Sequence, residues 1–310
     1  MGLTAFILVG PTASGKSDVA LRIAAAQGWC ILAADSMVVY RGMDVGTAKP
    51  TPAARAAVPH DGLDLVPCSE SFSAGRFREY ALEALGRRTA AGSTVMVVGG
   101  TGLYVKALVC GLGGGVVGGA VREGVRARIE SEGVDALAAE LDRIDPAGSA
   151  AVRDRRNPRR VARAMERAVA GAPAPAGWRG SPWKGGPAVG LWIEPAALRM
   201  RVAERAAAMF RGGLLEEVRG LLAAGSLSET AREAIGYAEA IDCIRGRCTV
   251  DEAVSRTAVR TCQLAKRQRT WFRHQIPVRW VDSTDMDTEQ AAAVVLAEWR
   301  ANGQTEISAG

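Results

Sequence analysis

The chain has 310 residues, of which 48% are hydrophobic and 23% are charged, and its formal net charge is +6. This composition is typical of a globular protein with one large domain, or a core with a smaller insertion, and it excludes a disordered chain. No basic segment precedes the apolar N-terminus, and no apolar run approaches the length of a membrane span. We therefore expect no signal peptide, no membrane association and a cytoplasmic location.

The six cysteines are scattered without a CxxC pair, and only two histidines accompany them. Structural zinc sites need closely spaced Cys and His ligands. We therefore expect no zinc site and free thiols in a reducing compartment.

The first strong pattern in the chain is a strand, a glycine-bounded loop and a helix. An apolar run over 5–9 predicts a strand, Gly10-Pro-Thr-Ala-Ser-Gly-Lys-Ser17 follows it, and a helical pattern begins at Asp18. This is the P-loop pattern in its structural context, where backbone N–H groups at a helix N-terminus bind an anion. Lys16 adds a mobile cation, and the hydroxyl of Ser17 is a candidate Mg²⁺ ligand. The predicted polyphosphate ligands are Gly10, Thr12, Ala13, Ser14, Gly15, Lys16 and Ser17.

The first hundred residues alternate short apolar strands with helical stretches, which is typical of a parallel sheet covered by helices. Strands are expected over 31–34, 94–98, 188–193 and 278–281. Helices are expected over 74–90, from 103 to 108, and over 196–211, 214–224, 231–244, 250–274 and 288–301. The tail after Asn302 is expected to fray.

Two glycine-rich segments, 111–119 and 171–187, interrupt this alternation, and the residues between them have helical periodicity. We predict a core formed by 1–113 and 188–310, with a helical insertion over 114–187. The predicted fold class is α/β, with a P-loop NTPase-like parallel sheet, helices on both faces and an inserted, mainly helical domain.

Two polar residues follow the predicted strands beside the P-loop. The strand over 94–98 ends in Gly99-Gly-Thr-Gly102, where hydrolytic P-loop proteins usually carry an acid, so we interpret the P-loop as holding a leaving group. Asp35 and Thr101 are expected at the rim of the phosphate site, where a carboxylate can be a general base and a hydroxyl can orient a nucleophile. The alternative is that Asp35 caps a helix and Thr101 is only a turn residue.

The positive charge is concentrated in two segments: 152–167 holds seven arginines and two acids, and 253–281 holds seven Lys or Arg and no acid. In each segment arginines recur on one helical face: Arg156, Arg160, Arg163 and Arg167 in the first, and Arg256, Arg260 and Arg267 in the second. Either face alone could simply be solvated. Together they favour nucleic acid, bound through phosphate contacts and shape.

Several longer motifs accompany the P-loop: Asp35-Ser-Met-Val-Val-Tyr-Arg-Gly-Met-Asp-Val-Gly-Thr-Ala-Lys-Pro50, Ser71-Phe-Ser-Ala74, Val98-Gly-Gly-Thr-Gly-Leu-Tyr104, Ala234-Ile-Gly-Tyr237, and Gln263-Leu-Ala-Lys-Arg-Gln268 with Trp271. In these motifs the chain resembles the tRNA dimethylallyltransferases, also called isopentenyl-tRNA or IPP transferases. The block over 35–50 is more diagnostic than the P-loop, because phosphate binding alone does not require it.

The resemblance implies transfer of the dimethylallyl group from dimethylallyl diphosphate to N6 of the adenosine 3′-adjacent to the anticodon in tRNA. It implies Mg²⁺ as cofactor, Asp35 as general base, Thr101 as an orienting group at the same centre, and Arg267 as a further diphosphate ligand. The implied tRNA contacts are Asp35, Ser36, Met37, Val38, Thr101, Arg126, Arg159, Arg160, Val161, Ala162, Arg163, Glu233, Ala234, Ile235, Gly236, Tyr237, Ala238, Thr261, Gln263, Lys266, Arg267 and Gln268. We expect a monomer that binds the anticodon stem-loop.

The chain departs from the family pattern at Glu233, Ala238 and Cys262, where the family usually has Gln, Lys and Arg. Each change removes a cation or adds an acid on the implied tRNA side. Three alternatives stay open at this point. They are a small-molecule P-loop kinase, an adenylate isopentenyltransferase that prenylates free AMP or ATP, and a non-catalytic RNA-binding protein.

Overall fold

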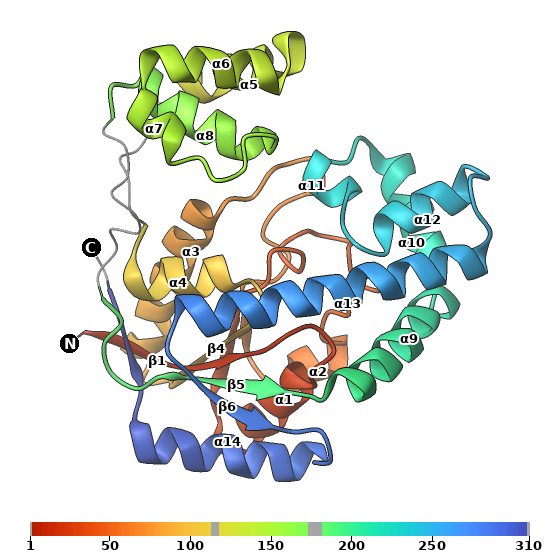
Figure 1. Cartoon of the computed structure of the whole chain (residues 1–310). Coiled ribbons are helices and arrows are strands. Elements are labelled where there is room, and N and C mark those ends of the chain that lie inside the picture. The colour runs from red at the N-terminus through yellow and green to blue at the C-terminus, as the bar shows by residue number, and fades with distance from the viewer. Residues whose placement is uncertain (1, 113–117, 173–181, 309–310) are drawn as a thin grey trace. The chain divides into compact units, whose positions relative to one another are not determined.

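The computed structural model describes residues 2–112, 118–172 and 182–308. The chain forms two compact units, Met1–Gly111 with Ser181–Gly310, and Leu112–Gly180 (Figure 1). These boundaries fall a few residues before the expected ones, so residues 182–187 belong with the core. The two glycine-rich connections expected from the sequence lie largely on residues 113–117 and 173–181, outside the described residues.

The first unit is built on a sheet with the order β3-β2-β4-β1-β5-β6, and β7 pairs with β1. The strands are β1 (Leu3–Val9), β2 (Cys30–Ala33), β3 (His60–Asp61), β4 (Val95–Gly99), β5 (Ala188–Trp192), β6 (Val278–Asp282) and β7 (Thr305–Ile307). All pairs along the main path are parallel, which confirms the predicted sheet.

The C-terminal tail forms β7, so the prediction that it frays was wrong. On the side of β5, β1 is paired only at its end, through Leu8 and Val9. The open edge over 3–5 is covered by β7 in antiparallel register, and Thr305 and Ile307 are buried there. Three residues of alternating burial are too short a signal to predict a strand from the sequence.

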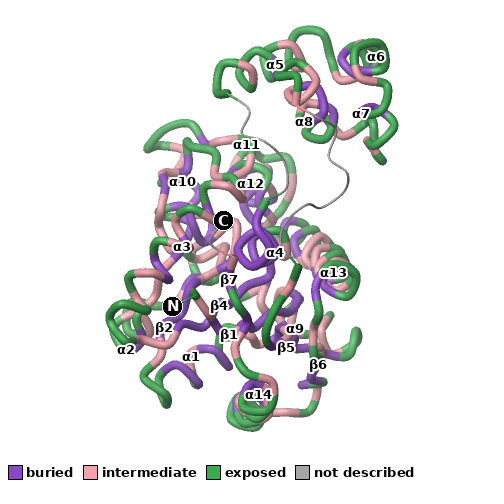
Figure 2. Tube along the Cα trace, turned by 90° about the vertical axis from the view of Figure 1, so that its left-hand side faces the viewer, coloured by how far each residue is buried: buried purple, intermediate pink, exposed green. Residues whose placement is uncertain are grey.

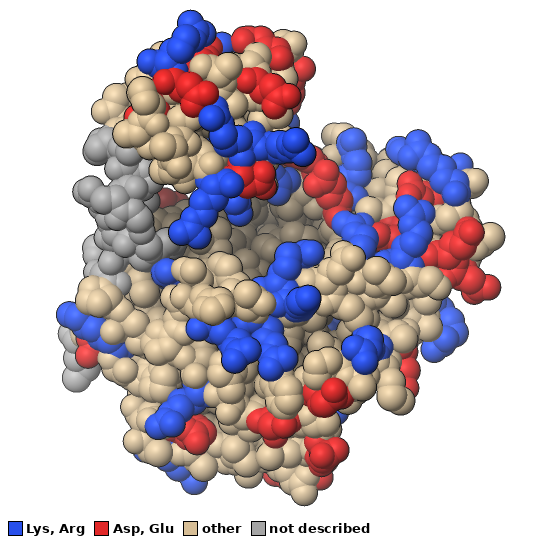
Figure 3. All heavy atoms as spheres, viewed as in Figure 1, with Lys and Arg blue, Asp and Glu red and all other residues tan. Residues whose placement is uncertain are grey.

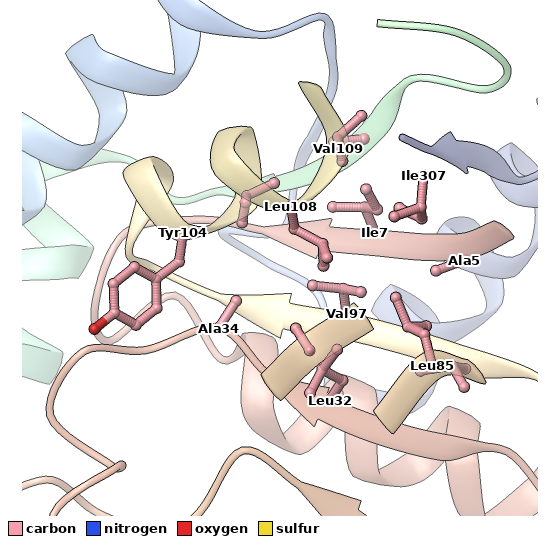
Figure 4. Close-up of a cluster of buried hydrophobic side chains, with 14 of the residues drawn as sticks. Ala5, Ile7, Leu32, Ala34, Leu85, Val97, Tyr104, Leu108, Val109 and Ile307 are labelled. Carbon is pink, nitrogen blue, oxygen red and sulfur yellow. The ribbon is translucent and has the colours of Figure 1, made fainter. Parts of the chain in front are cut away.

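Helices cover both faces of the sheet, as predicted. On one face lie α1 (Lys16–Gln27) and α14 (Thr288–Asn302), and on the other α3 (Ala74–Ala90), α4 (Gly102–Cys110) and α13 (Val250–Gln275). Because successive strand residues point to opposite faces, Leu8 packs towards α1 while Ile7 packs towards α4. Figure 4 shows the buried cluster on the face covered by α3 and α4, where Ile7 and Val97 pack near Leu108.

A third group of helices packs against the segment that follows β2. It comprises α9 (Pro195–Arg211), α10 (Leu214–Ala224), α11 (Glu229–Arg232) and α12 (Tyr237–Ile244). The single helix predicted over 231–244 was wrong, because the chain turns between α11 and α12 and Gly236 has φ 91°, which an α-helix does not allow. The short α2 (Pro52–Ala57) was not predicted because it buries no residue and has no amphipathic pattern.

The second unit contains α5 (Gly119–Glu132), α6 (Val134–Ile144), α7 (Pro146–Ala150) and α8 (Pro158–Val169). Its small core brings together Val125, Leu137, Leu141, Val161 and Met165 (Figure 2, purple). The apolar face predicted for α8 is confirmed except at its end, where Val169 is 54% exposed. None of the described helices in either unit is long and apolar enough to cross a membrane.

Candidate functional site

The P-loop runs from β1 into α1 as the sequence predicts. Ala13 and Gly15 both adopt positive φ, 63° and 82°, and Gly15 caps α1 without a side-chain hydrogen bond. The first backbone N–H groups of α1 therefore have no side-chain cap, as in loops that bind phosphate. The hydroxyl of Ser14 is buried and has no hydrogen-bond partner in the described structure.

A cavity of about 720 Å³ opens beside this loop. Of the predicted diphosphate ligands, those that line it are Thr12, Ala13, Gly15, Lys16 and Ser17. Gly10 and Ser14 are not among its lining residues. Asp35 also lines the cavity, and so do Val45 and residues 47–51.

Two arginines that the sequence analysis missed also line the cavity. Arg201 and Arg205 lie one turn apart on α9, the helix that begins after β5. A Cβ built on Gly15 would be 3.9 Å from Nη1 of Arg201, so this guanidinium lies over the start of α1. The sequence does carry a signal for them: two arginines spaced i, i+4 on the helix after a predicted strand, at the end of the sheet where ligands bind. Arg267, implied as a diphosphate ligand, is instead exposed on α13 and does not line the cavity.

Two cations of the cavity, Lys16 and Arg205, are poorly solvated. Desolvation lowers the pKa of Lys16 to about 8; Arg205 adds to this shift and the carboxylate of Asp35 opposes it. Desolvation also lowers the pKa of Arg205 against the attraction of Asp35 and Asp18. Such groups gain an interaction partner when an anion enters, so the cavity favours a polyanionic ligand.

Asp35 and Thr101 follow the adjacent strands β2 and β4, at the same edge of the sheet. Asp35 Oδ1 accepts a hydrogen bond of 2.8 Å from the backbone N–H of Met37, and Thr101 Oγ1 accepts one of 3.0 Å from Ser36. Thr101 precedes α4 but does not cap it through its side chain. The Thr101 hydroxyl is therefore joined to the Asp35 segment through Ser36, and Asp35 lines the cavity whereas Thr101 is not among its lining residues.

Glycines in the Gly99–Gly102 motif allow close packing around Thr101. A Cβ on Gly99 would be 2.0 Å from the carbonyl oxygen of Ala34, and one on Gly102 would be 2.1 Å from the ring of Trp271. Any larger residue would separate β4 from β2, or α4 from α13. The motif is thus explained by packing that fixes the backbone on both sides of Thr101.

Gln268, an implied tRNA contact, links two loops of the site. Its Oε1 accepts a hydrogen bond of 2.8 Å from the N–H of Thr12, and its Nε2 donates one of 2.9 Å to the carbonyl of Gly100. The Thr12 amide is therefore bound within the protein. Gln268 holds the P-loop against the segment before Thr101.

The basic face predicted on α13 is largely neutralised. Arg256 pairs with Asp242 of α12 at 3.1 Å, and Arg260 pairs with the buried carboxylate of Glu239. The sequence pattern missed this because the acids lie on another helix. On the face drawn in Figure 3, Lys and Arg side chains still gather along α13, where Lys266 and Arg267 are exposed.

The remaining implied tRNA residues divide by exposure. Those at least partly exposed are Ser36, Met37, Arg126, Arg159, Arg160, Ala162, Arg163, Glu233, Ile235, Ala238, Thr261 and Gln263. Those buried are Val38, Val161, Ala234, Gly236 and Tyr237. Val161 lies in the core of the second unit, so its side chain supports α8 and does not face solvent.

Comparison with known proteins identifies the family. The model of the IPP transferase family matches residues 38–275 of this chain. The chain belongs to the IPP transferase family. A second model, isopentenyl transferase, matches residues 3–60 of this family member.

Relatives of this IPP transferase match along nearly the whole chain. The tRNA dimethylallyltransferase of Rhodococcus jostii is 38% identical and covers 96% of this chain and 97% of its own. That of Methylococcus capsulatus is 40% identical, with 94% and 96% covered. The crystal structure of the tRNA isopentenylpyrophosphate transferase of Bacillus halodurans has a TM-score of 0.68 at 33% identity and covers 96% of this chain and 97% of its own.

Proposed function

We propose that the protein transfers the dimethylallyl group of dimethylallyl diphosphate to N6 of the adenosine 3′-adjacent to the anticodon in tRNA. The observation that carries this proposal is the carboxylate of Asp35 in a cation-lined P-loop cavity, in a member of the IPP transferase family, with the Thr101 hydroxyl bound to the N–H of the next residue, Ser36. We also propose that the protein is a cytoplasmic monomer.

The diphosphate of the donor would bind the P-loop backbone together with Lys16, Arg201 and Arg205, which line one cavity. During transfer the bond between C1 of the dimethylallyl group and the bridging oxygen breaks, and both electrons leave with the diphosphate. Fixed cations stabilise this developing charge more strongly than that of the bound donor.

The acceptor adenine is a weak nucleophile, because the lone pair of its exocyclic amine is delocalised into the ring. Asp35 would accept a proton from N6 as the N6–C1 bond forms, and Thr101 would orient the amine. The adenine must leave its stack to reach these groups, as bases modified by enzymes generally do.

Mg²⁺ is proposed as the cofactor. The cavity is lined by the oxygen ligands this ion prefers, namely the hydroxyl of Ser17 and the carboxylate of Asp18, so the donor set fits. When bound, the ion would supply positive charge beside the diphosphate oxygens.

Incubation of an anticodon stem-loop with dimethylallyl diphosphate and Mg²⁺, followed by mass analysis, tests the function. A gain of one prenyl unit on the expected adenosine supports it. Free AMP in place of the stem-loop separates the first alternative, because equal prenylation of AMP would indicate an adenylate isopentenyltransferase. A further reaction with ATP in place of dimethylallyl diphosphate tests the second, because only a kinase would transfer the γ-phosphoryl group of ATP to an acceptor.

We expect the double substitution of Arg160 and Arg163 with Ala to weaken stem-loop binding about tenfold at low salt. Both side chains are exposed on α8 of the second unit, and each lost phosphate contact reduces the salt dependence of binding. Fluorescence anisotropy over a range of salt concentrations measures both effects.

Replacing Arg143, an exposed arginine of α6, removes charge from the same unit and is the control. Single-turnover rates at saturating RNA should stay unchanged in the double variant. A loss of rate at saturation would contradict a role confined to binding.

A further inference from the structure

The segment over residues 43–50 forms one wall of the donor cavity. Val45, Thr47, Ala48 and Lys49 all line the cavity, and Ala48 has φ 50°. The segment is compact: the N–H of Ala48 donates to Val45 O at 3.1 Å, and that of Lys49 donates to Asp44 O at 3.1 Å. The conformation of this segment thus sets the position of four side chains around the cavity.

Three successive N–H groups of this wall point at one carboxylate, that of Glu217 on α10. Oε2 of Glu217 accepts from Asp44 at 2.9 Å and from Val45 at 2.7 Å, and Oε1 accepts from Gly46 at 3.4 Å. Successive backbone N–H groups form a cradle for an anion, and here a side chain of the protein fills it. Glu217 is half-buried and does not itself line the cavity.

The same carboxylate also binds Tyr237, the first residue of α12. The phenol O–H donates to Oε1 of Glu217, and Tyr237 is only 1% exposed. A Cβ on Gly46 would be 2.4 Å from the ring, so the wall packs directly on it. Desolvation and the carboxylate raise the pKa of Tyr237, which keeps its hydroxyl protonated and able to donate.

We propose that Glu217 is a positioning residue that fixes the 43–50 wall in the shape that binds the prenyl diphosphate donor, with Tyr237 as its second anchor. The identity of the donor rests on the proposed function. The wall contacts the ligand, whereas Glu217 acts through the backbone of the wall. On this view Tyr237, implied by resemblance as a tRNA contact, acts on the donor side.

A second set of contacts keeps the wall folded when Glu217 is changed. Nζ of the buried Lys49 binds Asp44 Oδ1 at 2.7 Å and Asp64 Oδ1 at 2.6 Å. These contacts join the wall to Asp64, in the chain segment that follows it, and involve neither α10 nor Tyr237. Loss of the Glu217 charge should therefore shift the wall within a folded protein.

The variant that tests the proposal is Glu217→Gln, which places an amide NH₂ against N–H donors and leaves at least one of them unpaired. Its matched control is Glu216→Gln, since Glu216 is exposed and pairs only with Arg219 among the described residues. Calorimetry with dimethylallyl diphosphate and Mg²⁺, without RNA, measures donor affinity directly.

We expect Glu217→Gln to weaken donor binding about tenfold or more and to raise the donor KM equally, with kcat at saturating donor changed less than threefold. Tyr237→Phe, which removes one hydroxyl, should raise the donor KM by a smaller factor, and Glu216→Gln should change nothing. A fall in kcat with unchanged donor affinity would overturn the proposal.

If the Glu217→Gln protein fails to fold, the Tyr237→Phe variant still tests the proposal. An unchanged donor KM in folded Tyr237→Phe would then overturn the proposal. Failure of the wild-type protein to prenylate the stem-loop would instead contradict the proposed function, and the calorimetric comparison would still test the wall.

Discussion

Asp35→Asn is expected to lower the single-turnover rate of prenyl transfer by about 10²–10⁴, the range for loss of a general base. The amide keeps the shape of the carboxylate and an oxygen that accepts the Met37 N–H, so the local turn should persist. The proton of the adenine N6 then has no acceptor on the protein. Rapid-quench measurement with stem-loop and donor both saturating gives this rate.

Two internal controls accompany the Asp35→Asn variant. Stem-loop affinity should stay within about threefold of wild type, because Asp35 lies in the donor cavity and not on the helical unit that carries Arg160 and Arg163. Donor affinity should stay the same or rise, since removing a negative charge near Lys16 reduces repulsion of the diphosphate. A near-normal rate in a folded variant would exclude Asp35 as the base.

The parts of the fold that the sequence predicts well are those whose information is local. The P-loop joins a strand to a helix within a few residues, and α3 and α10 have the bounds that hydrophobic periodicity predicts. Asp35 and Thr101 could be placed because parallel strands end at one edge of a sheet, so only the order of elements was needed.

The parts that the sequence could not predict depend on distant residues. Arg201 and Arg205 belong to the site only because α9 forms part of the cavity wall. The ion pairs of Arg256 and Arg260 depend on acids of α12. The division between α11 and α12 depends on the backbone of one glycine, Gly236. Helical spacing describes one face of one helix and does not say what opposes that face.

The charge of Lys16 should control donor affinity above neutral pH. Its pKa in the ligand-free protein is lowered to about 8 by desolvation. A bound diphosphate raises that pKa, because opposite charge favours the protonated amine. Below pH 8 the amine is protonated before and after binding and affinity is flat. Above pH 8 binding must take up a proton, so affinity falls by up to about tenfold per pH unit.

Substitutions of Lys16 separate this effect from other titrations. Lys16→Met should weaken dimethylallyl diphosphate binding and lower the transfer rate by about 10²–10³, the range for loss of one charged group that stabilises a leaving group. Lys16→Arg keeps its charge throughout, so the decline in affinity above pH 8 should disappear even if the geometry costs some rate. Calorimetry from pH 7 to pH 10 measures these profiles. An identical decline in Lys16→Arg would assign the titration to another group and remove Lys16 from the binding of the diphosphate.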